Sequence, residues 1–67
     1  MPHILTSREK EVFINLINNM STKEIASKLF ISEKTVRNHI SYVMQNLRVW
    51  GRAQAVVELI RLNEISL

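Results

Sequence analysis

Residues 32–45 read SEKTVRNHISYVMQ, with polar side chains at regular intervals between apolar ones. If this segment is helical, a rotation of about 100° per residue separates an apolar face from a polar one. The outward, polar face carries no carboxylate after Glu33 and consists of Lys34, Asn38, Ser41, Tyr42 and Gln45, with Arg37 and His39 on its shoulders. Hydrogen-bond donors and acceptors of these kinds suit contact with phosphates and with the edges of bases.

The basic residues are concentrated in the middle of the chain. Residues 21–52 hold six basic and two acidic residues, a balance of +4, whereas the remainder holds three basic and four acidic residues, a balance of −1. A basic stripe attracts polyanions such as nucleic acid or anionic lipid, through its local field and through counterion release. The charge distribution alone does not distinguish a polyanion-binding surface from an ordinary solvated one, which remains the alternative.

Helix-start signals predict an all-α fold. Thr6-Ser-Arg-Glu9 and Ser21-Thr-Lys-Glu24 are capping boxes, and Ser32 is a good N-cap residue. A single glycine and a single proline leave few helix breakers. We expect four helices, at about residues 7–18, 22–30, 33–47 and 53–62.

Each of the first three predicted helices has one apolar side. The apolar positions are Val12, Phe13, Leu16, Ile17 and Met20, then Ile25, Ala26, Leu29 and Phe30, then Val36, Ile40, Val43, Met44 and Leu47. Asn19 is expected to end the first helix, because asparagine tolerates the left-handed conformation. Only about two residues separate the second and third helices, so these two must cross at a steep angle. A tight turn before a helix with a polar outer face describes a helix-turn-helix.

The fourth predicted helix is apolar on two sides. Ala55, Leu59 and Leu62 form one side, and Val56, Val57 and Ile60 form the other. A surface helix of a monomer should not be apolar over most of its circumference. Either this helix is deeply buried or its second side meets a partner, and we expect self-association through Val56, Val57 and Ile60.

Length and composition exclude several classes of protein. Sixty-seven residues make one small domain, expected to span residues 5–67 with residues 1–4 disordered. The absence of cysteine removes a disulfide framework and a thiolate metal site. No apolar run approaches the roughly 18–20 residues that cross a bilayer, and no secretion signal is visible. We therefore expect a cytoplasmic protein with no membrane partner.

Four strings in the chain resemble a known family, namely LTSREKEVF, TKEIASKLFIS, EKTVRNHI and RAQAVVEL. They are similar to the DNA-binding domain of the LuxR/FixJ/NarL transcription factors, and most similar to its small stand-alone members, the GerE-type sporulation regulators. The resemblance extends from about Leu5 to Leu67. It implies a bacterial transcription regulator without a cofactor, whose third helix enters the major groove of double-stranded DNA and whose fourth helix forms a homodimer. RNA polymerase is a further candidate partner.

The resemblance also implies which residues contact DNA. By position, the base-reading residues of the family fall at Arg37, Asn38 and Ser41, and its phosphate contacts fall at Thr22, Lys23, Lys34, Thr35, Arg52 and Gln54. The side-chain chemistry agrees, because arginine can donate two hydrogen bonds to guanine and asparagine can pair with adenine through two. Thr22 and Lys23 would lie at a helix N-terminus, where free amides favour a phosphate. Glu9 matches a buried or capping acid of the family.

The chain departs from the family pattern at several positions. Many members have glycine at the positions of Asn19, Arg48 and Asn63. Arginine is strained if φ is positive there, so we expect at Arg48 either a different backbone or a strain accepted for an additional cation near DNA. Ser41 replaces a lysine of some relatives, which should weaken the attraction to the DNA backbone. Trp50, unusual in a linker, is expected to pack partly against the core, and the alternatives are that it joins a partner surface or simply lies exposed.

Other functions fit the sequence less well. Without cysteine or aspartate, and with no second histidine one turn from His3 or His39, the sequence predicts no metal site. Ser41 has no base within reach on its helix, so no enzyme is expected. Region 4 of a sigma factor shares the REKEV…EIA…S..TV pattern but usually ends soon after its recognition helix, and the segment RAQAVVELI argues against it. A protein-interaction module that kept the fold without binding DNA remains the alternative from another class.

Overall fold

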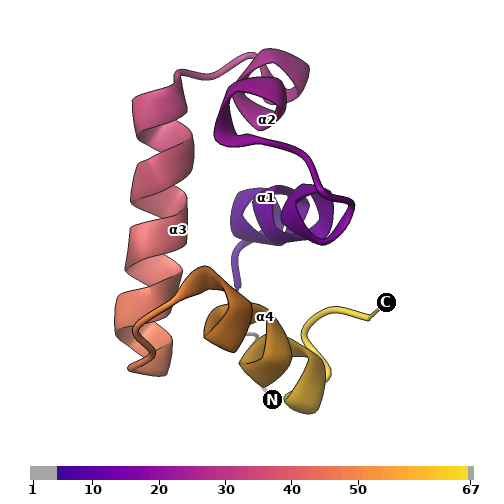
Figure 1. Ribbon diagram of the computed structural model, residues 1–67, viewed down its shortest axis with the longest axis vertical. Helices are drawn as coiled ribbons and strands as arrows, with labels where there is room; N and C mark the ends of the chain where they lie inside the picture. The colour runs from indigo at the N-terminus through magenta and orange to yellow at the C-terminus, as the bar shows by residue number, and fades with distance from the viewer. Residues whose placement is uncertain (1–4, 67) are drawn as a thin grey trace.

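Four α-helices form the part of the chain that the computed structural model describes, residues 5–66 (Figure 1). The helices are α1 (Ser7–Ile17), α2 (Thr22–Leu29), α3 (Glu33–Leu47) and α4 (Arg52–Arg61). Their ends agree with the predicted ones to within one residue, and the all-α prediction is confirmed. No helix among these residues is long and apolar enough to cross a bilayer. The segment 1–4, predicted to be disordered, lies outside the described residues.

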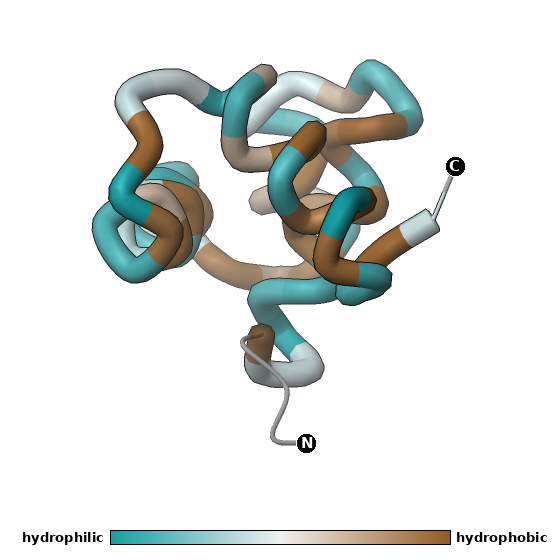
Figure 2. The backbone as a smooth tube through the Cα atoms, turned by 90° about the horizontal axis from the view of Figure 1, so that it is seen from below, coloured by the Kyte–Doolittle hydropathy of each residue, from teal (hydrophilic) through white to brown (hydrophobic). Residues whose placement is uncertain are grey.

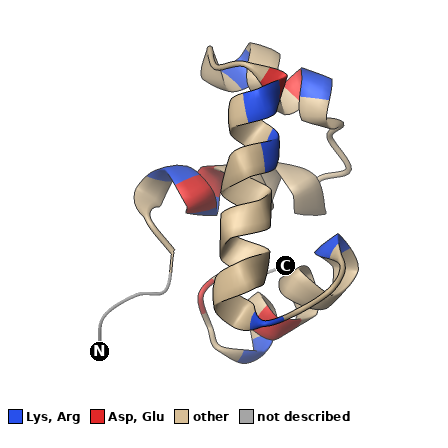
Figure 3. Ribbon diagram, turned by 90° about the vertical axis from the view of Figure 1, so that its left-hand side faces the viewer, with Lys and Arg blue, Asp and Glu red and all other residues tan. Residues whose placement is uncertain are grey.

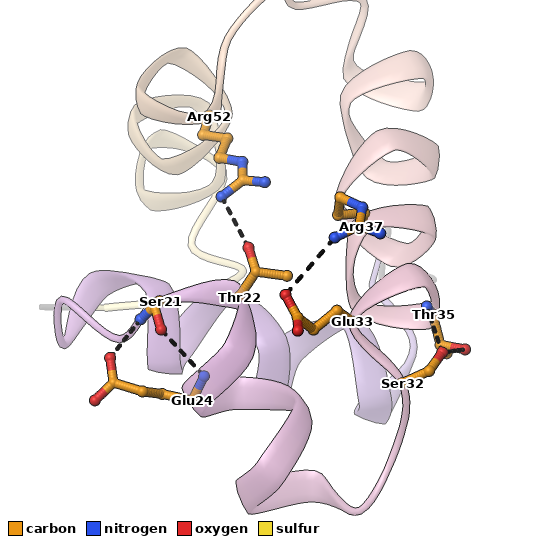
Figure 4. Close-up of polar contacts among 8 residues, drawn as sticks. All are labelled: Ser21, Thr22, Glu24, Ser32, Glu33, Thr35, Arg37 and Arg52. Carbon is orange, nitrogen blue, oxygen red and sulfur yellow. Dashed lines mark hydrogen bonds and ion pairs between the residues drawn. The ribbon is translucent and has the colours of Figure 1, made fainter.

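Capping boxes define the first residues of α1 and α2. The Thr6 hydroxyl accepts from the Glu9 N–H at 3.1 Å, while the Glu9 carboxylate, which is buried, accepts from the Thr6 N–H at 2.9 Å. Ser21 and Glu24 repeat both bonds at 3.1 and 2.8 Å (Figure 4). The bond from the Ser21 backbone, then that from its side chain, lowers the pKa of Glu24. The stability this adds is present above the ordinary glutamate pKa and is lost as the pH falls through the lowered value.

The two remaining helices begin differently. Ser32 Oγ accepts from the Thr35 N–H at 3.0 Å, which starts α3 at the predicted residue. Gly51 precedes α4 and offers no side-chain cap, and α4 begins at Arg52, one residue before its predicted start. Because no side chain caps α4, the sequence contains no local signal that distinguishes a helix start at Arg52 from one at Ala53.

Helix α3 is the central element, because it packs against each of the other three helices (Figure 1). Viewed end-on in Figure 2, its hydrophobic side is turned toward the other helices and its hydrophilic side faces out. Val36, Ile40 and Val43 are almost completely buried on the inner side. The other buried apolar residues are Leu5, Val12, Phe13, Ile25, Ala26, Leu29, Ala55, Leu59 and Ile65.

Left-handed residues connect the helices. Asn19 (φ 64°) follows the C-cap Asn18 of α1, and Asn63 (φ 59°) follows α4, so the left-handed conformation expected at Asn19 is confirmed. Phe30 (φ 58°) ends α2 and Arg48 (φ 57°) ends α3. Of the two expectations for Arg48, the structure therefore supports the strained one, since a non-glycine residue in this region costs about 1–2 kcal/mol.

Two predictions about aromatic residues were wrong. Phe30 was assigned to the apolar side of the second helix, but it is 95% exposed, because the chain turns into the left-handed region there and directs the side chain outward. Trp50 was expected to pack partly against the core and is 93% exposed. Val49 occupies the position next to the core instead, and its neighbour Trp50 points into solvent.

Replacing Phe30 by glycine is expected to stabilise the domain by about 0.5–1 kcal/mol. Glycine adopts φ 58° without steric conflict, and the exposed phenyl ring contributes little packing. Urea unfolding followed by circular dichroism measures the change. Phe30→Ala is the control, because it removes the ring and keeps the strain; a glycine variant no more stable than the alanine variant would show that the strain is negligible.

Candidate nucleic-acid interface

The outward face of α3 is a continuous polar surface. Arg37, Asn38 and Ser41 are all exposed on the side opposite the buried valine and isoleucine residues. Figure 3 looks onto this face, with basic residues near the N-terminal end of α3 and again just beyond its C-terminal end. No charged residue lies between Arg37 and Arg48, so the middle of the face offers only neutral donors and acceptors. Such a face can donate to and accept from base edges, and the basic residues near its ends can contact bases or phosphates.

Arg37 is held by an ion pair in the free protein. Its Nη1 lies 3.8 Å from Oε1 of Glu33, one turn earlier on α3 (Figure 4). Both side chains are about half exposed, with relative accessibilities of 54% and 49%. An exposed pair of this kind contributes at most about 1 kcal/mol, and less in salt. The guanidinium can therefore exchange Glu33 for another acceptor at small cost.

The N-termini of α2 and α4 are linked beside α3 by one side-chain hydrogen bond. Arg52 Nη1 donates to Thr22 Oγ1 at 3.4 Å, which joins the first residues of the two helices (Figure 4). Lys23 follows Thr22 and is exposed. Helix N-termini present free amides and a positive dipole end, so this corner combines two dipoles with two cationic side chains. It is suited to bind a phosphate group.

Two of the residues expected to contact phosphate also make bonds within the protein. The Gln54 side-chain oxygen accepts from the Trp50 N–H at 2.9 Å and so fixes the loop before α4. The Thr35 hydroxyl lies 2.9 Å from the Ser32 hydroxyl at the start of α3. Lys34, in contrast, is exposed beside them. Gln54 still carries an amide NH2 group and can donate it to a phosphate without breaking the loop contact.

Sequence reasoning missed one polar contact in the interior. Asn15 is buried, donates to the Glu11 carbonyl at 2.9 Å and accepts from Lys28 Nζ at 3.1 Å. This chain of bonds connects α1 to α2, so one of the six central basic residues is directed toward α1. An asparagine within an apolar helical stripe was the only signal for it in the sequence.

The expected dimer surface on α4 is only partly free. Val57 is 65% exposed, whereas Val56 and Ile60 are half-buried and pack against the core. Beside them Arg61 donates to Glu58, from Nε at 3.1 Å, and this bond lowers the pKa of Glu58 and raises that of Arg61. Val57 is therefore the residue whose side chain a second copy would cover most.

Metal ligands do not gather anywhere in the described part of the chain. Within residues 5–66 no group of three or more histidine, cysteine, aspartate or glutamate side chains could hold an ion. His39 is half-exposed on the shoulder of α3, and His3 lies outside the described residues.

Helices α2 and α3 cross at a steep angle (Figure 1), and α3 has a polar outer face. This arrangement defines a helix-turn-helix DNA-binding domain. The chain belongs to the luxR family of bacterial regulatory proteins, whose sequence model matches residues 3–59. The resemblance drawn from the sequence motifs is thereby confirmed. The domain is that of a GerE-like transcription regulator, and the family consists of regulators rather than enzymes.

Individual relatives support the same conclusion. The spore germination protein GerE of Bacillus subtilis is 66% identical over 64 residues, which cover 96% of this chain and 86% of that protein. The transcriptional regulatory protein DegU of Brevibacillus brevis is 49% identical over 59 residues, covering 88% of this chain but only 25% of DegU. A solved structure of the transcription factor GerE superimposes with a TM-score of 0.94 at 55% identity and covers 97% of each chain.

Proposed function

We propose that residues 5–67 form one unit that binds double-stranded DNA in a sequence-specific manner and regulates transcription in the cytoplasm. Helix α3 lies in the major groove, where Arg37, Asn38 and Ser41 face the base edges. The supporting observation is the outward face of α3, an exposed polar surface on a helix whose inner side is fixed against the other three helices. A rigid helix of this kind holds its donors in a fixed register, which base recognition requires.

The phosphate contacts position the domain on the duplex. The corner formed by the N-termini of α2 and α4 is proposed to hold one strand, and the start of α3 to contact the other. The residues involved are Thr22, Lys23, Lys34, Thr35, Arg52 and Gln54. These contacts contribute affinity and register and carry no sequence information.

The active form is proposed to be a homodimer joined through α4. Val57 is covered at the centre, with Val56 and Ile60 beside it, so that two copies bind two half-sites. Half-sites about 10 base pairs apart, one turn of DNA, place both copies on the same face of the duplex. RNA polymerase is a further proposed partner. GerE is named a spore germination protein, and a role in sporulation is proposed for this chain by analogy.

Selection from a random pool of duplexes tests this function. The expected product is a pair of related half-sites, enriched over several rounds at moderate salt. A pool that stays random would favour the rival function, a protein-interaction module with this fold. The sigma-factor alternative fits less well, because α4 follows α3 directly and is a regular helix of 10 residues.

Lys23→Ala is expected to weaken binding equally to all sequences. The lost cation sits at the helix N-terminus facing a phosphate, so the slope of log affinity against log salt should become shallower by about one. Fluorescence anisotropy over a range of salt concentrations measures this slope on the selected duplex and on an unrelated one. Lys10→Ala on α1 also removes an exposed lysine and is the control. A changed sequence preference in Lys23→Ala would mean that Lys23 contacts bases.

A further inference from the structure

A surface hollow lies beside the C-terminal half of α3. Its volume is about 510 Å³, and its lining residues are Ser41, Met44, Gln45, Arg48, Val49 and Trp50. The indole of Trp50 forms one side of the hollow and is itself 93% exposed. A large aromatic side chain that is left in water with apolar neighbours indicates an interaction surface.

The position of the hollow connects it to the outward face of α3. Ser41 and Gln45 belong to that face, and Arg48 follows one turn later on the same side. The residues around Val57 line a different hollow, which shares only Val49 with the first. Of the two surfaces, the hollow at Trp50 therefore continues the DNA-facing side and the other continues the proposed dimer side.

The length of α3 indicates what lies at its C-terminal end when DNA is bound. Its 15 residues span about 22 Å, whereas the major groove is about 12 Å wide. Since the N-terminal residues of a recognition helix contact the bases, the last turns of α3 reach the edge of the groove. That edge is the sugar–phosphate backbone.

Charge around the hollow matches this occupant. Arg48 lines the hollow together with Trp50, so that one cation stands beside the aromatic ring. Arg48 ends α3 in the left-handed conformation, with φ 57°. An apolar ring face suits deoxyribose, the indole N–H can donate to a phosphate, and a guanidinium can pair with one.

We infer that this hollow receives a segment of the DNA backbone, with Arg48 on a phosphate and the Trp50 ring against the adjoining sugar. The inference rests on the proposed function, because it requires α3 to lie in the groove. The contact extends the interface beyond the residues implied by the family. It adds affinity and leaves base preference unchanged, since sugar and phosphate are the same at every step.

Trp50 is the only tryptophan of the chain, so its fluorescence reports directly on the hollow. On addition of the selected duplex, its emission is expected to shift or to be quenched, and its quenching by acrylamide to fall several-fold. Trp50→Ala is expected to bind the selected and the unrelated duplex about 5- to 10-fold more weakly, with their ratio unchanged. Because the ring is exposed, circular dichroism should show an unaltered fold.

Phe30→Ala is the matched control, since it removes an equally exposed aromatic ring outside the hollow. Equal weakening by both variants would overturn the assignment to the hollow. Wild-type tryptophan emission that does not change on addition of the duplex, or an affinity of Trp50→Ala equal to that of the wild type, would overturn it as well. The proposed function would still stand if Arg37→Ala loses binding. Emission that changes with protein concentration alone would assign the hollow to a second copy and so overturn the inference. A wild-type protein that binds no duplex would refute the proposed function itself.

Discussion

Arg37→Ala and Asn38→Ala are each expected to weaken binding to the selected duplex by roughly 5- to 150-fold, the equivalent of about 1–3 kcal/mol. Each side chain can form two hydrogen bonds to one base, arginine to guanine and asparagine to adenine. Both are exposed on α3, so their removal leaves the core intact. Binding to an unrelated duplex should fall much less, and the preference for the selected sequence should relax at one base pair for each variant.

Anisotropy titrations on duplexes that vary at single positions measure both effects. Arg8→Ala is the control for Arg37→Ala, because Arg8 has a comparable exposed ion pair, with Glu11 at 3.7 Å on α1. The two variants lose the same charge and a similar ion pair, so a larger loss of affinity in Arg37→Ala reports a contact of Arg37 with DNA, and a loss confined to the selected duplex assigns that contact to a base. Equal affinities of wild type, Arg37→Ala and Asn38→Ala would exclude α3 as the recognition helix.

Val57→Glu is expected to abolish the dimer. An isologous interface contains each substitution twice, and an unpaired carboxylate buried among valine and isoleucine side chains should raise the dimer dissociation constant by at least about 100-fold. Sedimentation equilibrium should then give the mass of one chain, 7.8 kDa, where the wild type gives twice that value. Binding to paired half-sites should also weaken and lose its cooperativity.

The choice of Val57 follows from its exposure. Ile60 packs partly against the core, so a carboxylate there would disturb the monomer as well. Ile14→Glu is the control, because it places the same charge at an aliphatic residue of α1 that is 40% exposed. A wild type that sediments as a monomer at high concentration would contradict the dimer, and so would dissociation by both variants alike.

The parts of the fold that follow from local chemistry could be predicted. Both capping boxes occur as expected, because the hydroxyl and the carboxylate three residues later interact over one turn only. The inner side of α3 was predictable for a similar reason, since a period of about 3.6 residues places Val36, Ile40 and Val43 on one line. The family resemblance was predictable because its motifs extend along nearly the whole chain.

The features that depend on tertiary packing could not be predicted. An aromatic residue near a helix end is normally assigned to the core. The apolar pattern of the second helix includes Phe30, and no neighbouring residue in the sequence indicates that the helix ends at Leu29 and that Phe30 adopts the left-handed conformation. At the next connection, Val49 packs against the core and its neighbour Trp50 is exposed, a choice that depends on the path of the loop between α3 and α4. The partial burial of Val56 and Ile60 likewise depends on how α4 lies against α3.

The residues of helix α3 that pack against the core and those that face outward lie on opposite sides of the helix, and this separation affects how such regulators diverge. Substitutions on its inner side change the free energy of unfolding, whereas those on its outer side chiefly change what the surface meets. Effects at residues without shared contacts add nearly independently. Under the proposed function, exchanges on the outer side are therefore expected to change the recognised sequence without a compensating change in the interior.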